Sequence, residues 1–544
     1  MTLRLRWLGR VTYADAHALQ RGLVATATDD HLLLLEHPHV YTLGLRANPA
    51  HVLVAPDKVG ADLVRTDRGG DVTYHGPGQL VGYPIFEVAP KVPGGRPDTV
   101  AWVRSVEGLV IDTLADLGVG ADRLDGYPGV WVDADSDRPR KICAIGVRLV
   151  RGRSMHGFAL NVEPDLAMFS HIVPCGIADK GVTSLAAEGV TVSMRQVVDA
   201  LCTRAVTRWG SGGWERQDVA WRERTSDLAP FSRGGGAGEP VRPPRSRARL
   251  AEAGVTTGLD ISTRKPEWVK ARVRITADAL RLKRTMRALE LVTVCEEAGC
   301  PNLSECWSDG TATFMINGSR CTRACGFCLV DTRLPAPPDP DEPDHVAEAV
   351  ARMGLSFAVV TAVARDDLDD GGAAGFAEVI AAVRRRNPGV QVEVLIPDCK
   401  GSPDALAVIF DARPDVLNHN IETVPRLQRA VRPSASYARS LSVLARAKAA
   451  GLVTKSSVMV GLGEAVDEVE STLADLAAVG VDIATVGQYL RPTTHHLPVA
   501  RWWTPEEFDQ LKAAGEALGI GHVEASPLTR SSYHARQAAA AATG

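Results

Sequence analysis

The 544-residue chain has little of three features that would place it in a special class: long apolar runs, an excess of one charge, and cysteine. No apolar run approaches the roughly 20 residues of a membrane helix, so we expect no membrane partner. The formal net charge of −4 lacks the basic excess with which nucleic-acid binders neutralise phosphates, so we expect no nucleic-acid partner. Ten cysteines are too few for a disulfide scaffold, and their crowding in one region indicates metal or redox chemistry.

The length and the local composition predict how the chain divides. One ordinary core cannot hold so many residues, so two or three domains are expected. Gly, Pro and Arg are dense from 222 to 258 and no apolar period continues there, which is typical of a flexible linker. We predict domains over 1–221 and 261–544 with a linker over 222–260. The N-terminus lacks an apolar segment followed by a cleavage site, so a cytoplasmic location is expected.

The first domain has the pattern of an α+β fold. Strand-like runs include HLLLLEH, QLVGYPIF, KICAIGVRLV and MHGFALNV, and the last two are joined by a turn at 151–153. The segment WVRSVEGLVIDTLADLG carries apolar residues at the spacing of an amphipathic helix. These patterns predict a largely antiparallel sheet with at least one covering helix.

The second domain repeats a strand, a polar loop and a helix. Buried-strand candidates are FAVVTAV, VQVEVLI, DVLNHNI, SSVMVGL and IATVGQYL, a rhythm that predicts a parallel (β/α) barrel or part of one. In such a barrel the polar residues just after the strands line the active-site rim, although ordinary loop polarity explains any single one of them. The candidates are Arg365, Asp366, Asp367, Asp398, Asn418, Asn420, Glu422, Glu464 and Gln488.

Six of the ten cysteines form two triplets, spaced C-x4-C-x5-C and C-x3-C-x2-C. A structural zinc site normally has four protein ligands, so three thiolates leave one coordination position open. Cys321, Cys325 and Cys328 have a spacing that suits a cubane cluster in which three irons each take a thiolate and the fourth stays free for a small chelator. The alternatives are a zinc knuckle and an electron-transfer ferredoxin site.

The second triplet follows a strand-like ATFMI and precedes the barrel rhythm, which resembles the radical S-adenosylmethionine (SAM) enzymes. The stretch TVCEEAGCPNLSECW narrows the resemblance to the lipoyl synthases. Further matching motifs are RDDLDDGGA, LNHNIETVPRL, TKSSVMVGLGE, TVGQYLRPTTHHLPV and PLTRSSYHA. The resemblance runs from about Lys265 to Arg536 and implies a partial barrel of the radical SAM type.

The lipoyl synthase resemblance also implies cofactors and ligands. It implies SAM and two [4Fe-4S] clusters, one on the second triplet with SAM on its open iron. The other, auxiliary cluster would be held by Cys295, Cys300, Cys306 and a serine of the RSSY motif. We assign that serine to Ser531, with Ser532 as the alternative. A weakly held serine ligand suits a cluster that is consumed as the sulfur source for C6 and C8 of an octanoyl chain.

Three positions depart from the usual lipoyl synthase pattern. Ala362 and Ala364 stand where the family has serine and aspartate before RDDL, and Ser457 replaces a glycine after TKS. The cluster ligands are unaffected, whereas details of the substrate and SAM pocket are open to change.

The first domain carries RGGDVTYHGPGQL, whose glycines allow a close approach of backbone to ligand. With KICAIGVRLV, MHGFALNV and HIVPCGIADKGVTSL following in order, it resembles the lipoyl(octanoyl) transferases over roughly Leu3 to Leu201. The resemblance implies a fold similar to biotin and lipoate protein ligases. The expected substrate-binding residues are Arg68, Gly69, Gly70, Asp71, Val72, Thr73, Tyr74, His75, Ala144, Ile145, Gly146, Gly157, Phe158 and Ala159.

Cys175 is the candidate nucleophile of this domain, because a thioester acyl group moves to a cysteine at little cost and from there to an amine. A nearby ammonium would favour the thiolate, and the family gives that role to Lys141. The alternatives are a buried structural cysteine and a surface lysine. Cys143, Cys202 and Cys399 have no such context and are expected to be ordinary thiols.

Together the two resemblances imply a natural fusion that catalyses two consecutive steps of protein lipoylation. The expected partners are octanoyl-acyl carrier protein, lipoyl domains of 2-oxoacid dehydrogenase E2 subunits and glycine cleavage H protein, and an electron donor such as ferredoxin or flavodoxin. The alternatives are an ATP-dependent lipoate or biotin ligase for the first half, an electron-transfer protein for the second, and a fusion in which one half is only a docking module.

Overall fold

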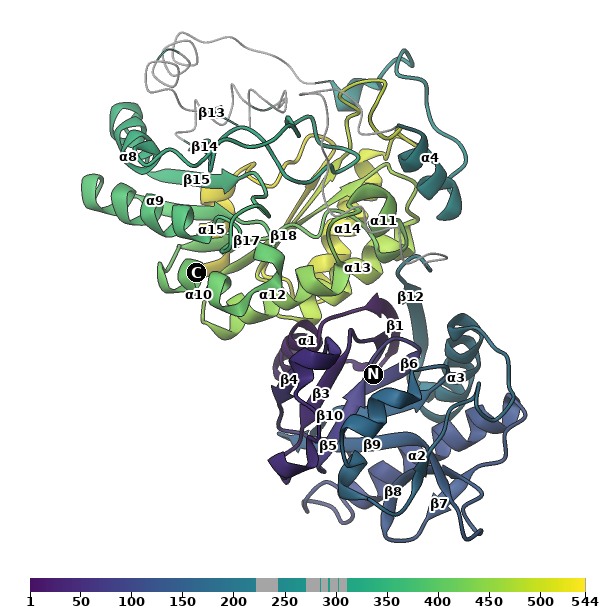
Figure 1. The fold of residues 1–544 in the computed structure, drawn as a ribbon. Helices are drawn as coiled ribbons and strands as arrows, with labels where there is room; N and C mark the ends of the chain where they lie inside the picture. Colours follow the sequence, from purple (N-terminus) through teal and green to yellow (C-terminus); the bar gives the residue numbers. More distant parts are fainter. Residues whose placement is uncertain (222–242, 271–283, 285–291, 294–301, 303–310, 544) are drawn as a thin grey trace. The chain divides into compact units, whose positions relative to one another are not determined.

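The computed structural model describes residues 1–221, 243–270, 284, 292–293, 302 and 311–543. Contacts divide the chain into two compact units, Met1–Trp221 and Arg222–Gly544, which are described separately below (Figure 1). No helix in the described part of the chain combines the length and the hydropathy needed to cross a bilayer.

The first unit is built on two sheets. The larger has the order β12-β1-β2-β6-β10-β9-β8-β7, with β11 paired to β9, and the smaller has the order β4-β3-β5. The strands are β1 (Leu3–Arg10), β2 (Asp30–Glu36), β3 (Val40–Leu43), β4 (Asp62–Arg65), β5 (Val72–His75), β6 (Gln79–Ile85), β7 (Asp122–Leu124), β8 (Tyr127–Val132), β9 (Arg140–Val150), β10 (Arg153–Asn161), β11 (Gly181–Val182) and β12 (Trp214–Asp218).

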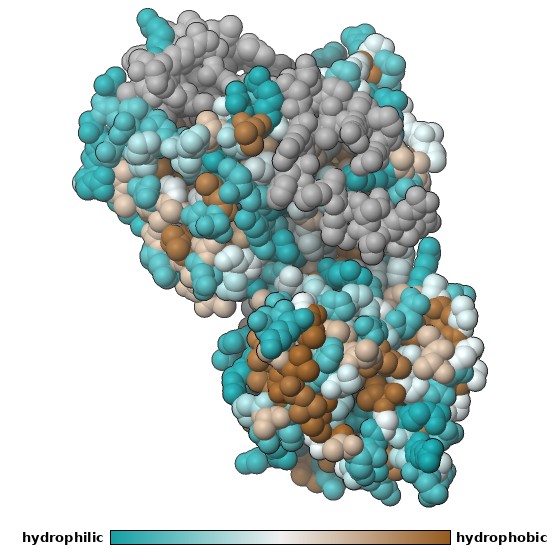
Figure 2. Space-filling model, in the orientation of Figure 1, coloured by the Kyte–Doolittle hydropathy of each residue, from teal (hydrophilic) through white to brown (hydrophobic). Residues whose placement is uncertain are grey.

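Three α-helices accompany these sheets: α1 (Tyr13–Thr26), α2 (Thr99–Asp116) and α3 (Met194–Trp209). The apolar stripe predicted for α2 packs, together with residues of α3, on the larger sheet, where Val106, Leu109 and Val197 are fully buried. The sheet is largely antiparallel, as the sequence predicts, but β1 pairs in parallel with both β2 and β12. Figure 2 shows apolar patches on one face of this unit, whose exposed apolar side chains include Leu45, Leu53 and Leu63.

The second unit contains an open sheet of the order β13-β14-β15-β16-β17-β18-β19-β20. Its seven strands from β14 onward are parallel, and only β13 is antiparallel to its neighbour. The strands are β13 (Val292–Thr293), β14 (Thr311–Ile316), β15 (Phe357–Ala362), β16 (Gln391–Leu395), β17 (Val416–Asn418), β18 (Thr454–Val460), β19 (Ile483–Gln488) and β20 (His522–Ser526). The described strands therefore form an open, partial (β/α) barrel, as the sequence predicts.

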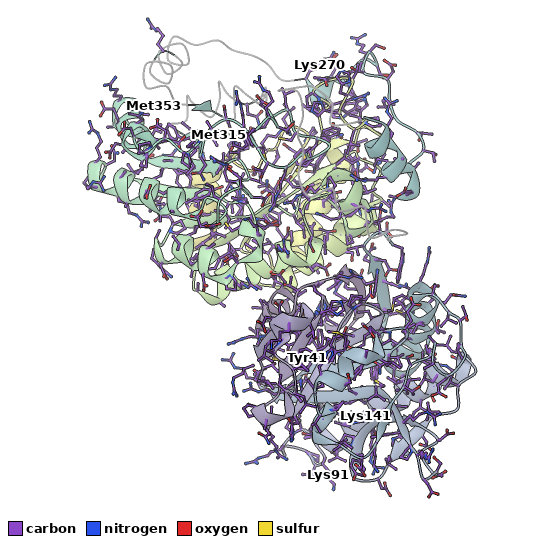
Figure 3. All side chains as sticks on the ribbon, viewed as in Figure 1. Tyr41, Lys91, Lys141, Lys270, Met315 and Met353 are labelled. Carbon is purple, nitrogen blue, oxygen red and sulfur yellow. The ribbon has the colours of Figure 1, made fainter. Side chains whose placement is uncertain are left out.

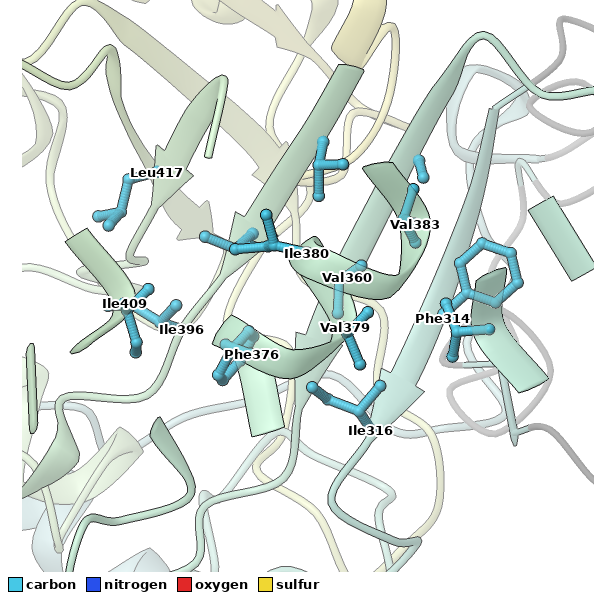
Figure 4. Close-up of a cluster of buried hydrophobic side chains, with 14 of the residues drawn as sticks. Phe314, Ile316, Val360, Phe376, Val379, Ile380, Val383, Ile396, Ile409 and Leu417 are labelled. Atoms are coloured by element: carbon cyan, nitrogen blue, oxygen red, sulfur yellow. The ribbon is translucent and has the colours of Figure 1, made fainter. Parts of the chain in front are cut away.

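Helices connect successive strands of this sheet, so each parallel pair has the crossover that such pairing requires. They are α8 (Glu342–Met353), α9 (Ala373–Arg386), α10 (Pro403–Asp411), α11 (Gln428–Val431), α12 (Tyr437–Ala449), α13 (Val466–Ala478) and α14 (Pro505–Ala517), and α15 (Ala535–Thr543) follows the last strand. Helix α9 shows how sequence produces this layer, because Phe376, Val379, Ile380 and Val383 recur at helical spacing. Their side chains pack in the cluster around β14 to β17 (Figure 4).

A further helix, α4 (Pro243–Glu252), lies inside the segment that the sequence predicts to be a linker. Leu250 and Ala253 are buried, and Arg426, just before α11, donates to the carbonyl of Ala253. The expectation of a segment without regular structure is therefore corrected for 243–252, where a short apolar stripe is hidden among Pro and Arg residues. Residues 222–242 of the predicted linker lie outside the described residues.

Candidate functional site

The first unit encloses a cavity of about 330 Å³, within the range of about 300–1,000 Å³ typical of small-molecule sites. Its walls come from the loop before β5 and from β5, β9 and β10, with the turn that carries Cys175. Of the residues that the sequence predicts to act here, those that line the cavity are Arg68, Gly69, Gly70, Asp71, Thr73, His75, Lys141, Ala144, Ile145, Gly146, Gly157, Phe158, Ala159 and Cys175.

Val72 and Tyr74 are the predicted substrate-binding residues that do not line this cavity. Side chains of a strand alternate between its two faces, so Thr73 and His75 of β5 face the cavity while these two face the opposite side. There they are fully buried in an apolar cluster, and the Tyr74 ring meets Phe169 edge to face. Their position indicates that they support the loop from behind.

Several lining residues were not predicted from the sequence, among them Tyr13, Tyr83, Tyr127 and His156. Tyr13 begins α1, far from the predicted motifs in sequence, and its hydroxyl lies 2.7 Å from Thr66 Oγ1. His156 precedes the predicted Gly157 and has a φ of 58°, a conformation uncommon for a residue with a side chain. His156 could have been predicted from the sequence, because it lies within the MHGFAL motif.

Cys175 occupies the short turn Pro174–Gly176 between two extended segments. Its φ is 56°, in the left-handed region that costs a non-glycine residue free energy and that clusters at functional sites. The amide of Gly176 closes the turn by donating to the Val173 carbonyl at 3.0 Å. The turn holds a half-buried Cys175 side chain at the cavity, accessible to a ligand there.

Lys141 lies on β9 and is almost fully buried, which is rare for a lysine without a partner. Its ammonium sits 4.7 Å from the centre of the Trp131 ring on the adjacent strand β8. Figure 3 labels Lys141 within the first unit. The ring face attracts the ammonium electrostatically, and no carboxylate of the described residues forms an ion pair with it. A buried positive charge thus lines the same cavity as Cys175.

The remaining groups of this unit differ from Cys175 in exposure. Burial holds the pKa of His75 well below its usual value, so its imidazole is neutral and shares a hydrogen bond of 2.8 Å with Gln79. Burial also raises the pKa of Cys143 far above normal and that of Cys202 to about 12. These two thiols belong to the apolar core.

In the second unit, the loop after β14 carries Cys321, Cys325 and Cys328. Backbone hydrogen bonds tie the loop to other parts of the barrel: Cys321 N donates to Asp331 O and Gly326 N to Val431 O, both at 2.8 Å. The fit at Gly326 is close, since a Cβ there would come within 2.7 Å of Leu497. The loop is therefore built into the barrel at several points.

The environment of these thiols suits a metal cluster. Cys321 Sγ accepts two backbone N–H groups, from Arg323 at 3.4 Å and Ala364 at 3.3 Å, and such contacts tune cluster sulfurs. The second donor is the main-chain N–H of residue 364. It is therefore kept although this chain has alanine there instead of the aspartate usual in lipoyl synthases. Burial raises the pKa of all three thiols, that of Cys325 to about 11, and a bound metal reverses this by binding the thiolate.

Arg323, inside the cysteine loop, connects it to two of the predicted rim residues. Its guanidinium makes a pair of 2.7 Å bonds to Asp366 and one of 2.6 Å to Asp398. Burial would raise the pKa of Asp398, but Arg323 and Arg439 hold it well below its usual range. This network fixes the loop against the ends of β15 and β16.

The other predicted rim residues have different surroundings. Glu464 accepts the amides of Gly461 and Leu462 in its own turn, and Gln488 bonds to the backbone around it, including Trp503 N at 2.9 Å. Glu422 is near enough to Cys325 and Cys328 to interact electrostatically with both. Glu464 and Gln488 therefore hold loops together, whereas Glu422 belongs to the cysteine site.

Arg365, Asp367, Asn418 and Asn420 complete the predicted set. Arg365 is buried and pairs with Asp367 at 2.8 Å. Asn420 Nδ2 donates to Glu422 at 3.0 Å. Asn418 Nδ2 donates at 3.2 Å to Glu393, which forms a fully buried ion pair of 3.0 Å with Lys455.

Comparison with known proteins decides what the second unit is. A lipoyl synthase of Rubrobacter xylanophilus is 57% identical over 275 residues, which cover 50% of this chain and 86% of that relative. A lipoyl synthase of Mycobacterium avium is 54% identical over 282 residues, covering 51% of this chain and 92% of the relative.

The chain belongs to the lipoyl synthase family.

Family models place this lipoyl synthase within the chain. The radical SAM superfamily matches residues 315–476, and the N-terminal domain of lipoyl synthases matches residues 245–300. The second match begins inside the predicted linker, within α4. The lipoyl protein ligase A/B catalytic domain matches residues 12–205, so the predicted fusion of two lipoylation domains is confirmed.

Among solved structures, an archaeal lipoate protein ligase from Thermoplasma acidophilum is 18% identical to this chain. It aligns with a TM-score of 0.32 and covers 41% of this chain and 88% of its own.

Family membership gives the lipoyl synthase unit SAM and a [4Fe-4S] cluster as cofactors. Cys321, Cys325 and Cys328 fit such a cluster, because they are three thiols on one anchored loop with N–H donors at a sulfur. Cys295, Cys300 and Cys306 lie outside the described residues.

The predicted serine ligands are described. Ser531 and Ser532 are half-buried in the turn after β20. Asn302, which lies in sequence between Cys300 and Cys306, donates to the Leu528 carbonyl at 2.6 Å. This contact places Asn302 itself next to Leu528, three residues before Ser531.

Proposed function

We propose that the chain catalyses two consecutive reactions on one octanoyl group. The first unit transfers octanoyl from octanoyl-acyl carrier protein through Cys175 to a lysine of a lipoyl-accepting domain. The second unit inserts two sulfurs into the attached chain at C6 and C8. The observation that carries the proposal is the cavity that brings a half-buried Cys175 and a buried Lys141 together with the glycine-rich loop.

In the first reaction the Cys175 sulfur attacks the thioester carbonyl and the carrier thiol leaves. The Lys141 ammonium favours the anionic sulfur electrostatically from its site over Trp131. Apolar groups such as Val81, Ile145 and Phe158 line the cavity and bury the acyl chain. The Cys175 thioester is close in free energy to the carrier thioester, so acylation needs no ATP. Transfer to the amine needs none either, because the amide product is lower in free energy than the thioester.

In the second reaction the cluster held by the Cys321 loop supplies, when bound, the electron that cleaves SAM and thereby the oxidising power to remove hydrogen from an unactivated carbon. The protein's own part is to hold the three thiols, to orient the loop through Arg323, Asp366 and Asp398, and to exclude water. Glu422, close to two of the thiols, is available to bind a cationic group of SAM.

We propose a second [4Fe-4S] cluster on Cys295, Cys300, Cys306 and Ser531 as the sulfur source. The contact between Asn302 and Leu528 supports this assignment, because it connects the two segments that must meet. An oxygen ligand binds iron less firmly than a thiolate, which suits a cluster that gives up its sulfur. Ser532 is the alternative ligand.

The proposed partners follow from the two reactions. Octanoyl-acyl carrier protein donates the chain, and the acceptors are lipoyl domains of 2-oxoacid dehydrogenase E2 subunits and glycine cleavage H protein. A ferredoxin or flavodoxin supplies electrons.

A ligase that activates its acid with ATP is the second candidate for the first unit, since the matching model covers lipoyl protein ligases A and B. The half-buried Cys175 at the cavity favours acyl transfer. The test is to incubate the chain with octanoyl-acyl carrier protein and a lipoyl domain without ATP, and to measure the intact mass of the domain. We expect one octanoyl increment; a strict requirement for ATP would overturn the proposal.

A further inference from the structure

The segment that follows β19 contacts the cysteine loop of the second unit through two adjacent residues. His496 Nε2 lies 2.9 Å from the Cys328 carbonyl oxygen, and Leu497 N donates to the Gly326 carbonyl at 3.0 Å. Gly326 lies between Cys325 and Cys328 in the sequence, so both contacts hold the half of the loop that carries these two thiols. The Leu497 bond is a main-chain contact, whereas the His496 bond depends on a side chain and is removed by one substitution.

The partners of His496 fix which ring nitrogen carries the proton. A carbonyl oxygen only accepts hydrogen bonds, so Nε2 donates to Cys328. Burial lowers the pKa of His496, so at neutral pH the ring is neutral and its Nδ1 is an acceptor. The Thr493 hydroxyl lies 2.8 Å from that nitrogen and accepts the His495 amide at 3.2 Å. The imidazole is therefore oriented by a hydrogen bond at each nitrogen.

The segment that carries His496 is itself anchored to the barrel. Tyr489, directly after β19, donates its amide to the Val460 carbonyl of β18 at 2.8 Å and its hydroxyl to the Leu497 carbonyl at 2.9 Å. Arg491 Nε donates to the His496 carbonyl at 3.0 Å. These bonds connect the backbone of His496 to two strands of the sheet, which is the support that a residue needs in order to position a metal ligand.

The site of this hydrogen bond matters because an iron–sulfur cluster with three thiolates is anionic and gains further negative charge when it is reduced. The Cys328 carbonyl oxygen adds a partial negative charge beside it. The His496 N–H group offsets that charge and fixes the peptide that carries the Cys328 thiol. We infer that His496 is a positioning residue of the SAM-binding cluster: it holds the Cys328 end of the loop and favours the reduced cluster. This inference rests on the cluster proposed above for this loop.

The chain offers a matched control, because the motif RPTTHHLPV contains two adjacent histidines in different surroundings. His495 is exposed and gives its main-chain amide to Thr493. His496 is half-buried and bonds to Cys328 through its ring. Alanine at position 495 keeps the amide, so His495→Ala removes a histidine from the same segment without removing the contact with the cysteine loop.

The test follows the cluster itself in the full chain after anaerobic loading with iron and sulfide. The reduced chain is measured by electron paramagnetic resonance, and the part of the signal that changes when SAM is added belongs to the cluster with the open iron. The decay of this SAM-responsive signal is followed in the presence of the iron chelator bathophenanthroline disulfonate. Its midpoint potential is measured by redox titration, so neither readout depends on the overall reaction.

His496→Ala and His496→Asn are expected to lose the signal about 10–100-fold faster than the wild type, the usual effect of removing a group that orients a metal ligand. Their midpoint potential becomes more negative, because the reduced cluster has lost a nearby N–H donor. His496→Gln places an amide N–H at the reach of Nε2 and restores most of both properties, which the shorter asparagine does not. His495→Ala matches the wild type in both.

Two results would overturn the inference. One is a His496→Ala signal that decays at the wild-type rate with an unchanged midpoint potential. The other is a His496→Gln variant as defective in both properties as His496→Ala, which is the signature of a ring that only fills space. A wild-type chain without any SAM-responsive signal would instead refute the cluster proposed for this loop and the inference together. The wild-type spectrum thus distinguishes the two failures.

Discussion

The two units hold their functional cysteines in different settings, although all of these thiols are half-buried. Cys175 stands alone on a turn with a left-handed φ and lines a cavity, whereas Cys321, Cys325 and Cys328 share one loop where burial raises the pKa of each thiol. A nucleophile must meet its substrate, so its exposure serves the reaction. A cluster ligand must be shielded from water and held by its neighbours. The surroundings of a thiol therefore tell more about its role than its presence in a motif.

The interiors of the two units also differ, in whether they contain a fully buried ion pair. The first unit packs its larger sheet with apolar side chains from β-strands and from α2 and α3. The second unit has the ion pair of Lys455 and Glu393 inside its barrel, both side chains with no exposed surface. Isolated buried charges are costly, so this pair must be complete to be tolerated.

The most direct test of this difference between the two kinds of cysteine is to replace each in turn. Cys175→Ala is expected to slow octanoyl transfer by at least about 10³-fold, because no other thiol at the cavity replaces the nucleophile. SAM cleavage by the second unit stays at the wild-type level. Intact mass of the lipoyl domain and chromatography of the SAM products measure the two. Transfer within tenfold of wild type would contradict the role of Cys175.

Cys325→Ala should have the reverse effect. We expect loss of about four irons per chain, the content of one [4Fe-4S] cluster, and no detectable SAM cleavage, with octanoyl transfer unchanged. Cys399→Ala is the matched control, because Cys399 is a thiol of the same unit that is buried in its apolar core rather than half-buried in the cysteine loop. Iron analysis and the transfer assay check the pair. Equal iron in both variants would be evidence against the cluster site.

Lys455→Met tests the charged interior. The variant leaves Glu393 buried without its partner, so we expect the second unit to lose about 3–5 kcal/mol of stability, the usual cost of breaking a buried pair. The double variant Lys455→Met/Glu393→Gln should recover part of the loss. Denaturant unfolding followed separately for each unit measures the effect. An equal shift of the first unit's transition would argue against this local explanation.

We expect a fall in pH to lower the free energy of unfolding of the first unit more than that of the second. Burial lowers the pKa of His31, His37 and His75 in the first unit, that of His37 to about 4, and that of His419 in the second to about 4. The unfolded chain binds the extra protons, so stability is lost as pH falls from about 6.5 toward 4. Between pH 7 and 5 the loss is about 2 kcal/mol per buried histidine.

The matching measurement is thermal unfolding of each unit at these two pH values. His37→Gln is expected to remove about 2 kcal/mol of the acid-induced loss from the first unit only. The interpretation would be wrong if this variant left the pH dependence of that unit unchanged, or if the second unit proved the more acid-sensitive.

The fold was largely predictable because its strands and helices carry clear apolar periods. The predicted parallel rhythm corresponds to β15 through β19, and the antiparallel hairpin of β9 and β10 was visible from its turn. The parallel pairing of β1 with β12 was not predictable, because it joins segments about 200 residues apart and depends on the completed core. The short helix α4 was hidden by Pro and Arg.

The candidate site was predictable where motifs are contiguous and not where the fold brings distant segments together. The glycine-rich loop and the Cys175 motif could be read directly, but the alternation of β5 sends Val72 and Tyr74 away from the cavity. Tyr13 lies outside every predicted motif and still lines the cavity, where its hydroxyl lies 2.7 Å from Thr66 Oγ1. Such contacts depend on tertiary pairing, which local sequence does not specify.

The central claim is that one octanoyl group passes through both sites. The most direct test supplies perdeuterated octanoyl-acyl carrier protein, SAM and reductant to the full chain and a lipoyl domain under anaerobic conditions, and measures the mass of the domain. We expect a lipoyl group in which two deuteriums are replaced by two sulfurs, with deuterium recovered in 5′-deoxyadenosine. A domain that keeps every deuterium and gains no sulfur, although SAM is cleaved and the clusters are loaded, would contradict the account.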